Sequence, residues 1–134
     1  MRERAMLMLI GLALAALLLA GCEPRDPRTG ARPLRSLPGA DPVKGKQLLG
    51  SWGCGSCHHI PGVTGADAYV GPPLDGWAER SFIAGELDNT PENLVRWIMD
   101  PQGVEPGTAM PDTDAPEDVA RHMAAYLYTL EPER

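Results

Sequence analysis

The stretch Cys54-Gly55-Ser56-Cys57-His58 decides most of what this chain can become. Two thiols three positions apart, followed at once by an imidazole, are the pattern by which a haem is attached covalently to a protein. Thiols at this spacing can each add to a vinyl group of one porphyrin, and the next residue is then held beneath the iron as an axial ligand. The small residues Gly55 and Ser56 keep the turn compact. The pattern therefore predicts one haem, bonded to Cys54 and Cys57 and ligated by His58.

A Cys-x-x-Cys pair has two other interpretations, a redox dithiol and half of a zinc site. A redox dithiol is typical of a βαβ context, and a zinc site needs a second pair of cysteine or histidine ligands. The sequence around Cys54 and Cys57 shows neither context, and the remaining cysteine, Cys22, has a different use. A structural or redox pair stays the alternative to haem attachment.

The sequence that precedes Cys22 indicates the role of this cysteine. Two arginines in residues 1–4 precede an apolar run from Met6 to Ala20, and Gly21 and Cys22 follow. The run is shorter than the roughly 20 residues that cross a membrane, although an uncleaved anchor helix is the alternative. Residues 1–21 resemble a bacterial lipoprotein signal peptide. The resemblance implies an acylated Cys22 and a location on the outer face of the cytoplasmic membrane, periplasmic or exterior.

The rest of the chain divides into a tether and one domain. Residues 22–40 contain four prolines and four arginines but no aromatic residue and no apolar period, which predicts a flexible segment. Residues 41–134 form a single small domain with six basic and fifteen acidic side chains. Such an acidic domain has no electrostatic footprint for nucleic acid.

The apolar spacing in residues 41–134 is helical. Asp41 can cap a first helix that delivers the chain to Cys54, Thr90 can cap a second that stops before Pro101, and a third opens near Asp114 and Pro116. We expect an all-α domain with three main helices and long loops. The expected apolar faces are, in chain order, Gly45, Leu48, Leu49 and Trp52; Leu94, Trp97 and Ile98; and Val119, Met123, Tyr126, Leu127 and Leu130.

Two loop segments, Gly71-Pro72-Pro73-Leu74 and Pro106-Gly107-Thr108-Ala109-Met110-Pro111, complete the pattern. With them, the chain from Asp41 onward resembles the class I (monohaem) c-type cytochromes, which implies the small cytochrome c fold around one haem c. The resemblance implies that the carbonyl of Pro72 accepts a hydrogen bond from the axial histidine, although a plain Gly-Pro turn is the alternative. It also implies that the thioether of Met110 is the sixth iron ligand.

The resemblance assigns further positions. Arg80 and Thr108 match residues that contact haem propionates, and Trp97 matches an aromatic residue packed beside the ligand methionine. Gly45 and Tyr126 match the crossing of the first and last helices, where a residue without a side chain admits an aromatic ring.

Four other residues compete for the iron or flank the site. Met99 is the nearest rival to Met110, but the helical period points it away from the inward face. Met123 lies on an apolar stripe and is expected to pack in the core. His59 follows His58 too closely to reach the opposite side of the same iron, and His122 is expected at the surface or an interface.

These expectations describe a lipid-anchored electron carrier with His58 and Met110 as axial ligands, with no catalytic residue and no substrate at the iron. Family analogy suggests a quinol-oxidising complex and a terminal oxidase as partners in a bacterial respiratory chain. The alternatives are a fixed subunit of a membrane oxidoreductase or oxidase complex and a peroxidase-type haem enzyme. Lys44 and Lys46 are the only lysines, so the lysine-rich rim of mitochondrial-type carriers is missing.

Overall fold

The computed structural model of the protein describes residues 36–132. The predicted signal peptide, Cys22 and most of the predicted tether lie outside the described residues. Between residues 36 and 132, no helix combines the length and the hydropathy that crossing a bilayer requires.

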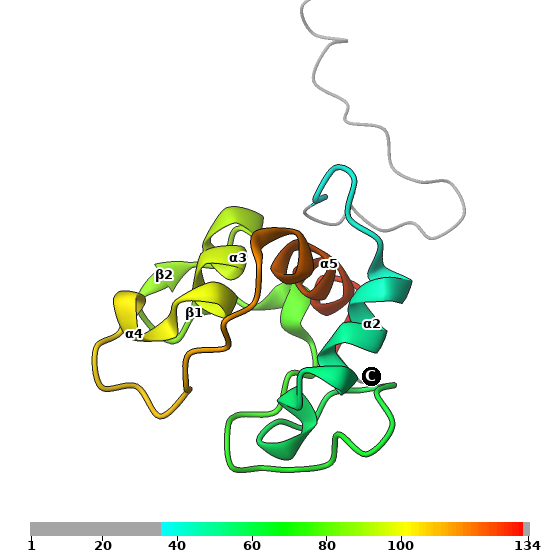
Figure 1. The fold of residues 1–134 in the computed structure, drawn as a ribbon, viewed down its shortest axis with the longest axis horizontal. Helices are drawn as coiled ribbons and strands as arrows, with labels where there is room; N and C mark the ends of the chain where they lie inside the picture. The colour runs from blue at the N-terminus through cyan, green and yellow to red at the C-terminus, as the bar shows by residue number, and fades with distance from the viewer. Residues whose placement is uncertain (1–35, 133–134) are drawn as a thin grey trace, which may run out of the picture. The chain divides into compact units, whose positions relative to one another are not determined.

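Three main helices form the framework, as the apolar spacing predicts (Figure 1). They are α2 (Pro42–Ser51), α3 (Pro91–Met99) and α5 (Glu117–Leu127). A short helix, α4 (Pro101–Val104), follows α3, and single 3-10 turns, η1 (Cys54–Ser56) and η2 (Trp77–Glu79), lie in the long loop segment between α2 and α3. The all-α prediction is confirmed, with long loops supplying much of the domain.

The predicted caps set where two of the helices begin. The carboxylate of Asp41 accepts from the main-chain N–H groups of Val43 and Lys44 at 2.8 and 3.3 Å. The hydroxyl of Thr90 accepts from the N–H of Asn93 at 3.2 Å. Each cap satisfies N–H groups that have no partner in the first turn, and each is followed by a proline that has no N–H to satisfy.

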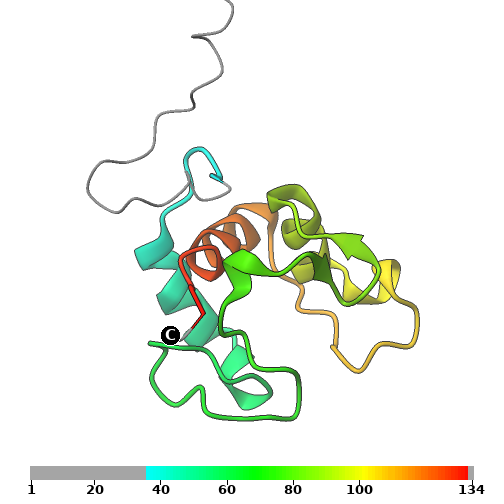
Figure 2. The same ribbon diagram turned by 180° about the vertical axis from the view of Figure 1, so that it is seen from behind.

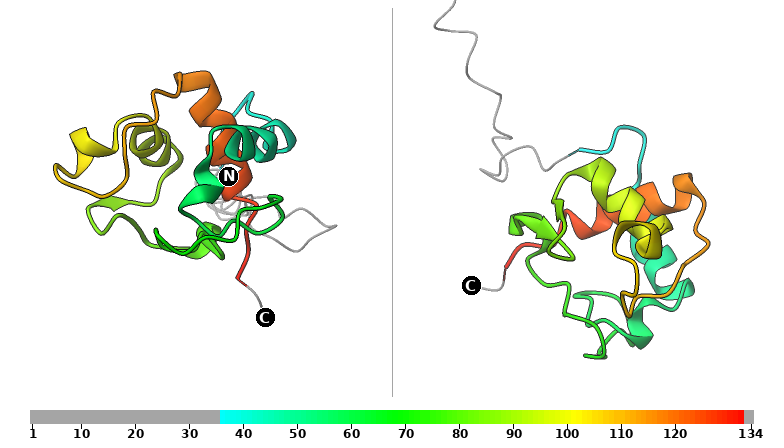
Figure 3. Two further views of the ribbon diagram at one scale, coloured as in Figure 1. Left: turned by 60° about the horizontal axis from the view of Figure 1, so that its bottom comes forward. Right: turned by 90° about the vertical axis from the view of Figure 1, so that its left-hand side faces the viewer.

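Helix α2 lies alongside α5, and α3 packs on α5 from another direction, which Figure 2 and Figure 3 show from further sides. Helices α2 and α5 approach each other closely at Gly45, where a Cβ atom would lie 1.8 Å from the carbonyl oxygen of His122. Gly45 thus lies at the crossing of the first and last helices, where its missing side chain admits the backbone of α5. The Tyr126 hydroxyl donates to the carbonyl of Pro61 at 2.7 Å.

His122, which was expected at the surface or an interface, takes part in the contact between α2 and α5. Its Nδ1 accepts from the main-chain N–H of Asp41 at 2.8 Å, and its ring is half-buried. The hydrogen bond ties the start of α2 to α5 across 81 positions of sequence. Sequence spacing alone could not indicate a bond between residues so far apart.

A small hairpin was not expected from the sequence. Strands β1 (Phe82–Ile83) and β2 (Leu87–Asp88) pair antiparallel, joined by a turn in which Ala84 and Gly85 both have positive φ. Positive φ at both central residues is typical of tight hairpin turns. Strands of two residues are too short to show the alternation by which a strand is predicted.

The packed domain begins before residue 41, where the sequence placed its boundary. Leu37 is buried in the hydrophobic core, and its carbonyl accepts from the N–H of Ala40 at 3.0 Å. The guanidinium of Arg121 on α5 donates to the carbonyl of Pro38 at 3.1 Å. A single apolar residue among prolines has no period, so its burial left no signal in the sequence.

Candidate functional site

A cavity of about 580 Å³ opens between the η1 segment on one side and the segment after α4 on the other. Its volume falls within the range of roughly 300–1,000 Å³ usual for sites that bind small molecules and cofactors. Helices α2, α3 and α5 contribute apolar side chains to its wall: Leu49, Leu94, Ile98, Met123 and Leu127. A largely apolar ligand can be held here away from water.

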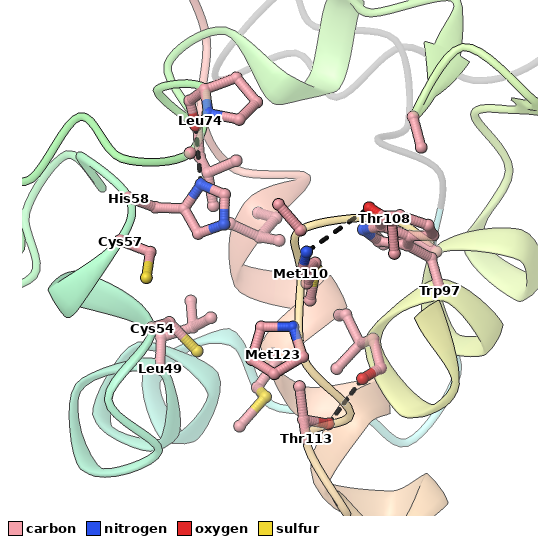
Figure 4. A pocket seen from close by; sticks show the side chains of 18 of the residues that line it. Leu49, Cys54, Cys57, His58, Leu74, Trp97, Thr108, Met110, Thr113 and Met123 are labelled. Atoms are coloured by element: carbon pink, nitrogen blue, oxygen red, sulfur yellow. Dashed lines mark hydrogen bonds between the residues drawn. The ribbon is translucent and has the colours of Figure 1, made fainter. Parts of the chain in front are cut away.

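The two thiols of the motif line this cavity, and their sulfur atoms lie beside it (Figure 4). Gly53, with φ of 76°, turns the chain from α2 into η1, and the carbonyl of Cys54 accepts from the N–H of Cys57 and of His58 at 3.2 and 3.0 Å. Neither thiol is in a disulfide. Burial raises the pKa of the Cys54 thiol, and the neighbouring Cys57 adds to the increase.

A small residue is required inside this turn. A Cβ atom at Gly55 would lie 2.8 Å from the Cα and Cβ atoms of Ala66, so the loop after the motif packs directly on the turn. Ala66 is itself buried, and its carbonyl accepts from the N–H of Ile60 at 2.9 Å. The motif is thus held rigidly with both thiols toward the cavity.

His58 is oriented by the loop that contains Gly71 and Pro72. Its Nδ1 lies 2.7 Å from the carbonyl oxygen of Pro72, as predicted (Figure 4). A carbonyl can only accept, so Nδ1 carries a hydrogen, and in the neutral imidazole Nε2 then keeps its lone pair. A neutral imidazole in this tautomer is ready to ligate a metal through Nε2.

Gly71 lies against the imidazole. A Cβ atom there would be 2.4 Å from Cε1 of His58, and the N–H of Gly71 donates to the carbonyl of Cys57 at 2.7 Å. The loop therefore fits the ring closely only because position 71 has no side chain.

Met110 and Thr108 line the cavity from the segment after α4, across the opening from His58 (Figure 4). The hydroxyl of Thr108 accepts from the N–H of Met110 at 3.5 Å. Trp97, half-buried on α3, lines the same cavity, as expected. The motif and the second loop segment, which are 48 positions apart in sequence, thus meet around one space.

The competing residues lie elsewhere or are committed to other contacts. Met99 lines a separate surface pocket between α3 and α5, with Arg96 and Arg121. Met123 is 1% exposed and forms part of the cavity wall from α5. His59 has its Nδ1 3.1 Å from the carboxylate of Asp75, and its ring stacks on Tyr69 with centroids 5.5 Å apart.

Arg80 lines the cavity and also braces the loop that orients His58. Its guanidinium donates to the carbonyls of Pro73 and Asp75, at 3.2 Å for Asp75, and lies 4.9 Å from the ring centre of Trp77. Burial lowers the pKa of Arg80, whereas the Asp75 carboxylate acts in the opposite direction. The cation remains charged and one side of it faces the cavity.

Trp77 was not predicted as a site residue. It is 5% exposed, lines the cavity, and its indole N–H has no hydrogen-bond partner in the described part of the chain. A buried donor without a partner is costly, and this one belongs to a residue of the cavity wall that lies beside Arg80. The propionate carboxylates of a haem are acceptors for such a donor, and the residues present fit that group.

Asn89 was also missed. Its side-chain amide donates to the carbonyls of Trp77 and Arg80 at 3.0 and 2.9 Å, and its carbonyl accepts from the hydroxyl of Tyr128 at 2.7 Å. The residue is 1% exposed, so this fully bonded amide fixes the η2 turn from inside. No local signal identifies it, because an asparagine just before a helix cap is ordinary in a loop. The one signal for Trp77 is its residue type, because tryptophan is highly buried on average and the chain has only three.

Within residues 36–132, no three or more histidine, cysteine, aspartate or glutamate side chains are grouped so that they could hold a metal ion. The second ligand pair that a zinc site would need is not found among these residues.

Comparison with known proteins places the fold. No family model matches the chain. It is 40% identical over 88 residues to cytochrome c oxidase subunit 2 of Alkalihalophilus pseudofirmus and 32% identical over 98 residues to that of Bacillus sp. strain PS3, covering 65% and 69% of this chain. The chain spans only about a quarter of the length of these relatives, 25% and 28%.

A solved structure of cytochrome c2 from Rhodobacter sphaeroides is similar with a TM-score of 0.54 at 21% identity, covering 71% of this chain and 99% of that one. The domain therefore has the small, all-α cytochrome c fold.

Proposed function

We propose that this protein carries electrons through one covalently bound haem c with His58 and Met110 as axial ligands. The observation that carries the proposal is the tautomer of His58. Its Nδ1 hydrogen is engaged by Pro72 at 2.7 Å, so the Nε2 lone pair is available on the side where two free thiols and Met110 line one cavity.

The bound haem would supply an iron that exchanges single electrons between its ferrous and ferric states. The chain's own residues supply the environment. Cys54 and Cys57 form the covalent links, and the hydrogen bond to Pro72 increases the electron density that His58 donates. Met110 closes the remaining axial position, so no substrate needs to reach the metal and no side chain acts as an acid or base. This is why we propose a carrier and not a haem enzyme of peroxidase type.

The polar residues of the cavity wall have a separate proposed role, which is to bind the haem propionates. Trp77, Arg80 and Thr108 line the cavity, and the indole N–H of Trp77 has no partner among the described residues. These groups suit the two propionate carboxylates, whose charge they would neutralise in a partly buried place. The apolar wall excludes water from the rest of the cavity, which favours rapid electron exchange with little reorganisation.

A terminal oxidase is the partner that the relatives favour, because both are named as subunit 2 of cytochrome c oxidase. The protein would work in a bacterial respiratory chain, and a quinol-oxidising complex is the proposed electron donor. The specific alternative is a fixed subunit of an oxidase complex. Co-purification with oxidase subunits through gentle solubilisation and gel filtration would favour that alternative over a mobile carrier.

We also propose that the protein is anchored by lipid on Cys22, on the outer face of the cytoplasmic membrane. The proposal rests on the signal-like sequence of residues 1–21. Mass spectrometry of the mature protein should find acyl chains on Cys22 and one haem on the Cys54 and Cys57 pair. Cys22→Ser should release a red, soluble protein, and a native protein that is already soluble would refute the anchor.

The central test is spectroscopic. Produced with its maturation machinery, the protein should contain one haem resistant to acid–acetone extraction, low-spin in both redox states, with a methionine–iron charge-transfer band in the ferric form. Cys54→Ala and Cys57→Ala should each impair attachment. A high-spin haem that binds peroxide would favour the peroxidase-type enzyme instead.

A further inference from the structure

Gln102 on α4 is bonded to the loop that contains Met110. Its side-chain N–H₂ donates to the main-chain carbonyls of Thr108 and Met110 at 2.8 and 3.0 Å, and its side-chain oxygen accepts from the N–H of Gly107 at 3.1 Å. Both donors and the acceptor oxygen of the amide are thus directed at the same four residues of chain.

The loop has few other ties. Apart from those to Gln102, the hydrogen bonds of residues 106–111 in the described structure stay within residues 105–110: Thr108 N–H donates to the carbonyl of Glu105, and Met110 N–H to the hydroxyl of Thr108. Pro106 and Gly107 are exposed, so few side-chain contacts hold this part of the loop. Gly107, with φ of 89°, gives the loop a point of conformational freedom.

The turn of α4 that contains Gln102 is fixed in place by its neighbours. Pro101, the preceding residue, is fully buried, and the N–H of Gly103, the following residue, donates to the carboxylate of Asp100 at 2.8 Å. Gln102 is itself half-buried, which limits competition from water for its hydrogen bonds. The segment 106–111 is therefore tied to a fixed turn of helix through one side chain.

We propose that Gln102 is a positioning residue that holds Met110 toward the cavity and so controls how readily this ligand leaves the iron. The inference rests on the proposed function, since it assigns a control element to the sixth ligand. By the same reasoning, exogenous ligands should enter the ferric site through opening of residues 106–111.

Two nearly isosteric variants separate hydrogen bonding from packing. Gln102→Met keeps the length and apolar contacts of the side chain and removes all three hydrogen bonds. Gln102→Glu keeps the acceptor for Gly107 and replaces two donors by a carboxylate that faces two carbonyls. The measurement is the rate of imidazole binding to the ferric holoprotein, because imidazole would have to displace Met110 from the iron.

We expect Gln102→Met to accelerate imidazole binding about tenfold or more, because loss of hydrogen bonds of ordinary net strength corresponds to about that factor. Gln102→Glu should be at least as fast, since repulsion is added to the loss of donors. The N–H of Gly107 should also exchange faster with solvent in Gln102→Met, as measured by NMR on the ferrous holoprotein, and this readout does not depend on methionine ligation.

Thr90→Ala is the matched control, because it removes the cap of α3 and touches no atom of the loop. It should lower the unfolding midpoint and leave the imidazole rate unchanged. The proposal is overturned if Gln102→Met binds imidazole at the wild-type rate, or if Thr90→Ala accelerates binding equally. A wild-type protein without a methionine–iron band would instead refute the axial assignment, and faster Gly107 exchange in Gln102→Met would then still report the hydrogen bonds of Gln102 without their role at the iron.

Discussion

The carbonyl oxygen of Pro72 lies 2.7 Å from Nδ1 of His58, and the residue before Pro72 is a glycine whose missing side chain leaves room for the imidazole ring. The two features act together. The carbonyl selects the tautomer of His58, and the bare backbone at Gly71 lets the loop approach closely enough for the hydrogen bond to form.

Gly71→Ala should therefore disturb the axial histidine. The added Cβ would lie 2.4 Å from Cε1 of His58, so the ring or the loop must move. We expect a lower yield of holoprotein and a shifted reduction potential, measured by haem absorbance and redox titration. Gly50→Ala, whose Cβ meets only Val63 at 3.6 Å, should behave like wild type. Equal yields and potentials for both variants would contradict the close fit.

Met110→Ala should abolish the methionine–iron band and lower the reduction potential by on the order of 100 mV or more, because a soft ligand that favours ferrous iron is lost. The ferrous variant should also bind carbon monoxide. Met99→Ala is the control, since Met99 lines a separate pocket and should leave spectrum and potential nearly unchanged. The axial assignment is wrong if the Met99 variant loses the band and the Met110 variant keeps it.

Trp77→Phe should lower the free energy of unfolding of the holoprotein by about 2 kcal/mol. It removes a proposed hydrogen bond to a charged carboxylate, and such bonds are stronger than those between neutral groups. The indole N–H of Trp77 is buried with no partner among residues 36–132, which fits a donor to a haem carboxylate. The measurement is denaturant unfolding of the ferric form. Trp97→Phe makes the same chemical change on a half-buried ring and should lower the free energy of unfolding by less. A larger loss for Trp97→Phe than for Trp77→Phe would contradict the proposed hydrogen bond from Trp77.

Gly45→Ala should destabilise the protein by about 3 kcal/mol, the upper end of what overpacking a well-filled interior costs. The added Cβ would lie 1.8 Å from the carbonyl oxygen of His122, so α2 and α5 must separate. Gly50→Ala on the same helix should be neutral or slightly stabilising, because alanine favours helix over glycine. Thermal unfolding of the two holoproteins checks the difference, and similar midpoints would show that the helices can shift freely.

Electron transfer to the membrane partner should depend little on ionic strength. Trp52 and Val70 line the cavity and are 40% and 82% exposed, whereas Lys44 and Lys46 lie on α2 and do not line it. Uncharged contacts are not screened, so the rate of soluble Cys22→Ser protein should change little up to about 0.1 M salt. Val70→Asp should slow the reaction with an apolar or acidic partner. A rate that rises steeply with salt would indicate an acidic partner or another docking face.

The sequence by itself determined the local structure and the chemistry that depends on nearest neighbours. Asp41 and Thr90 cap helices because their side chains reach N–H groups two or three residues on, and the Cys54–His58 motif acts within one turn of chain. The segments that contain Pro72 and Met110 could be related to the motif through a family resemblance. The structure brings both to the cavity that the motif lines.

Only the tertiary structure decided the partners of Gly45, Trp77, Asn89 and Gln102. The carbonyl of His122 against Gly45, or Tyr128 bonded to Asn89, are contacts between residues far apart in sequence, and no period or cap encodes them. A side-chain amide looks the same in the sequence whether it faces solvent or binds the loop that contains Met110. The difference arises when the helices pack, because packing excludes water and each buried polar group must then find a partner within the protein or on its cofactor.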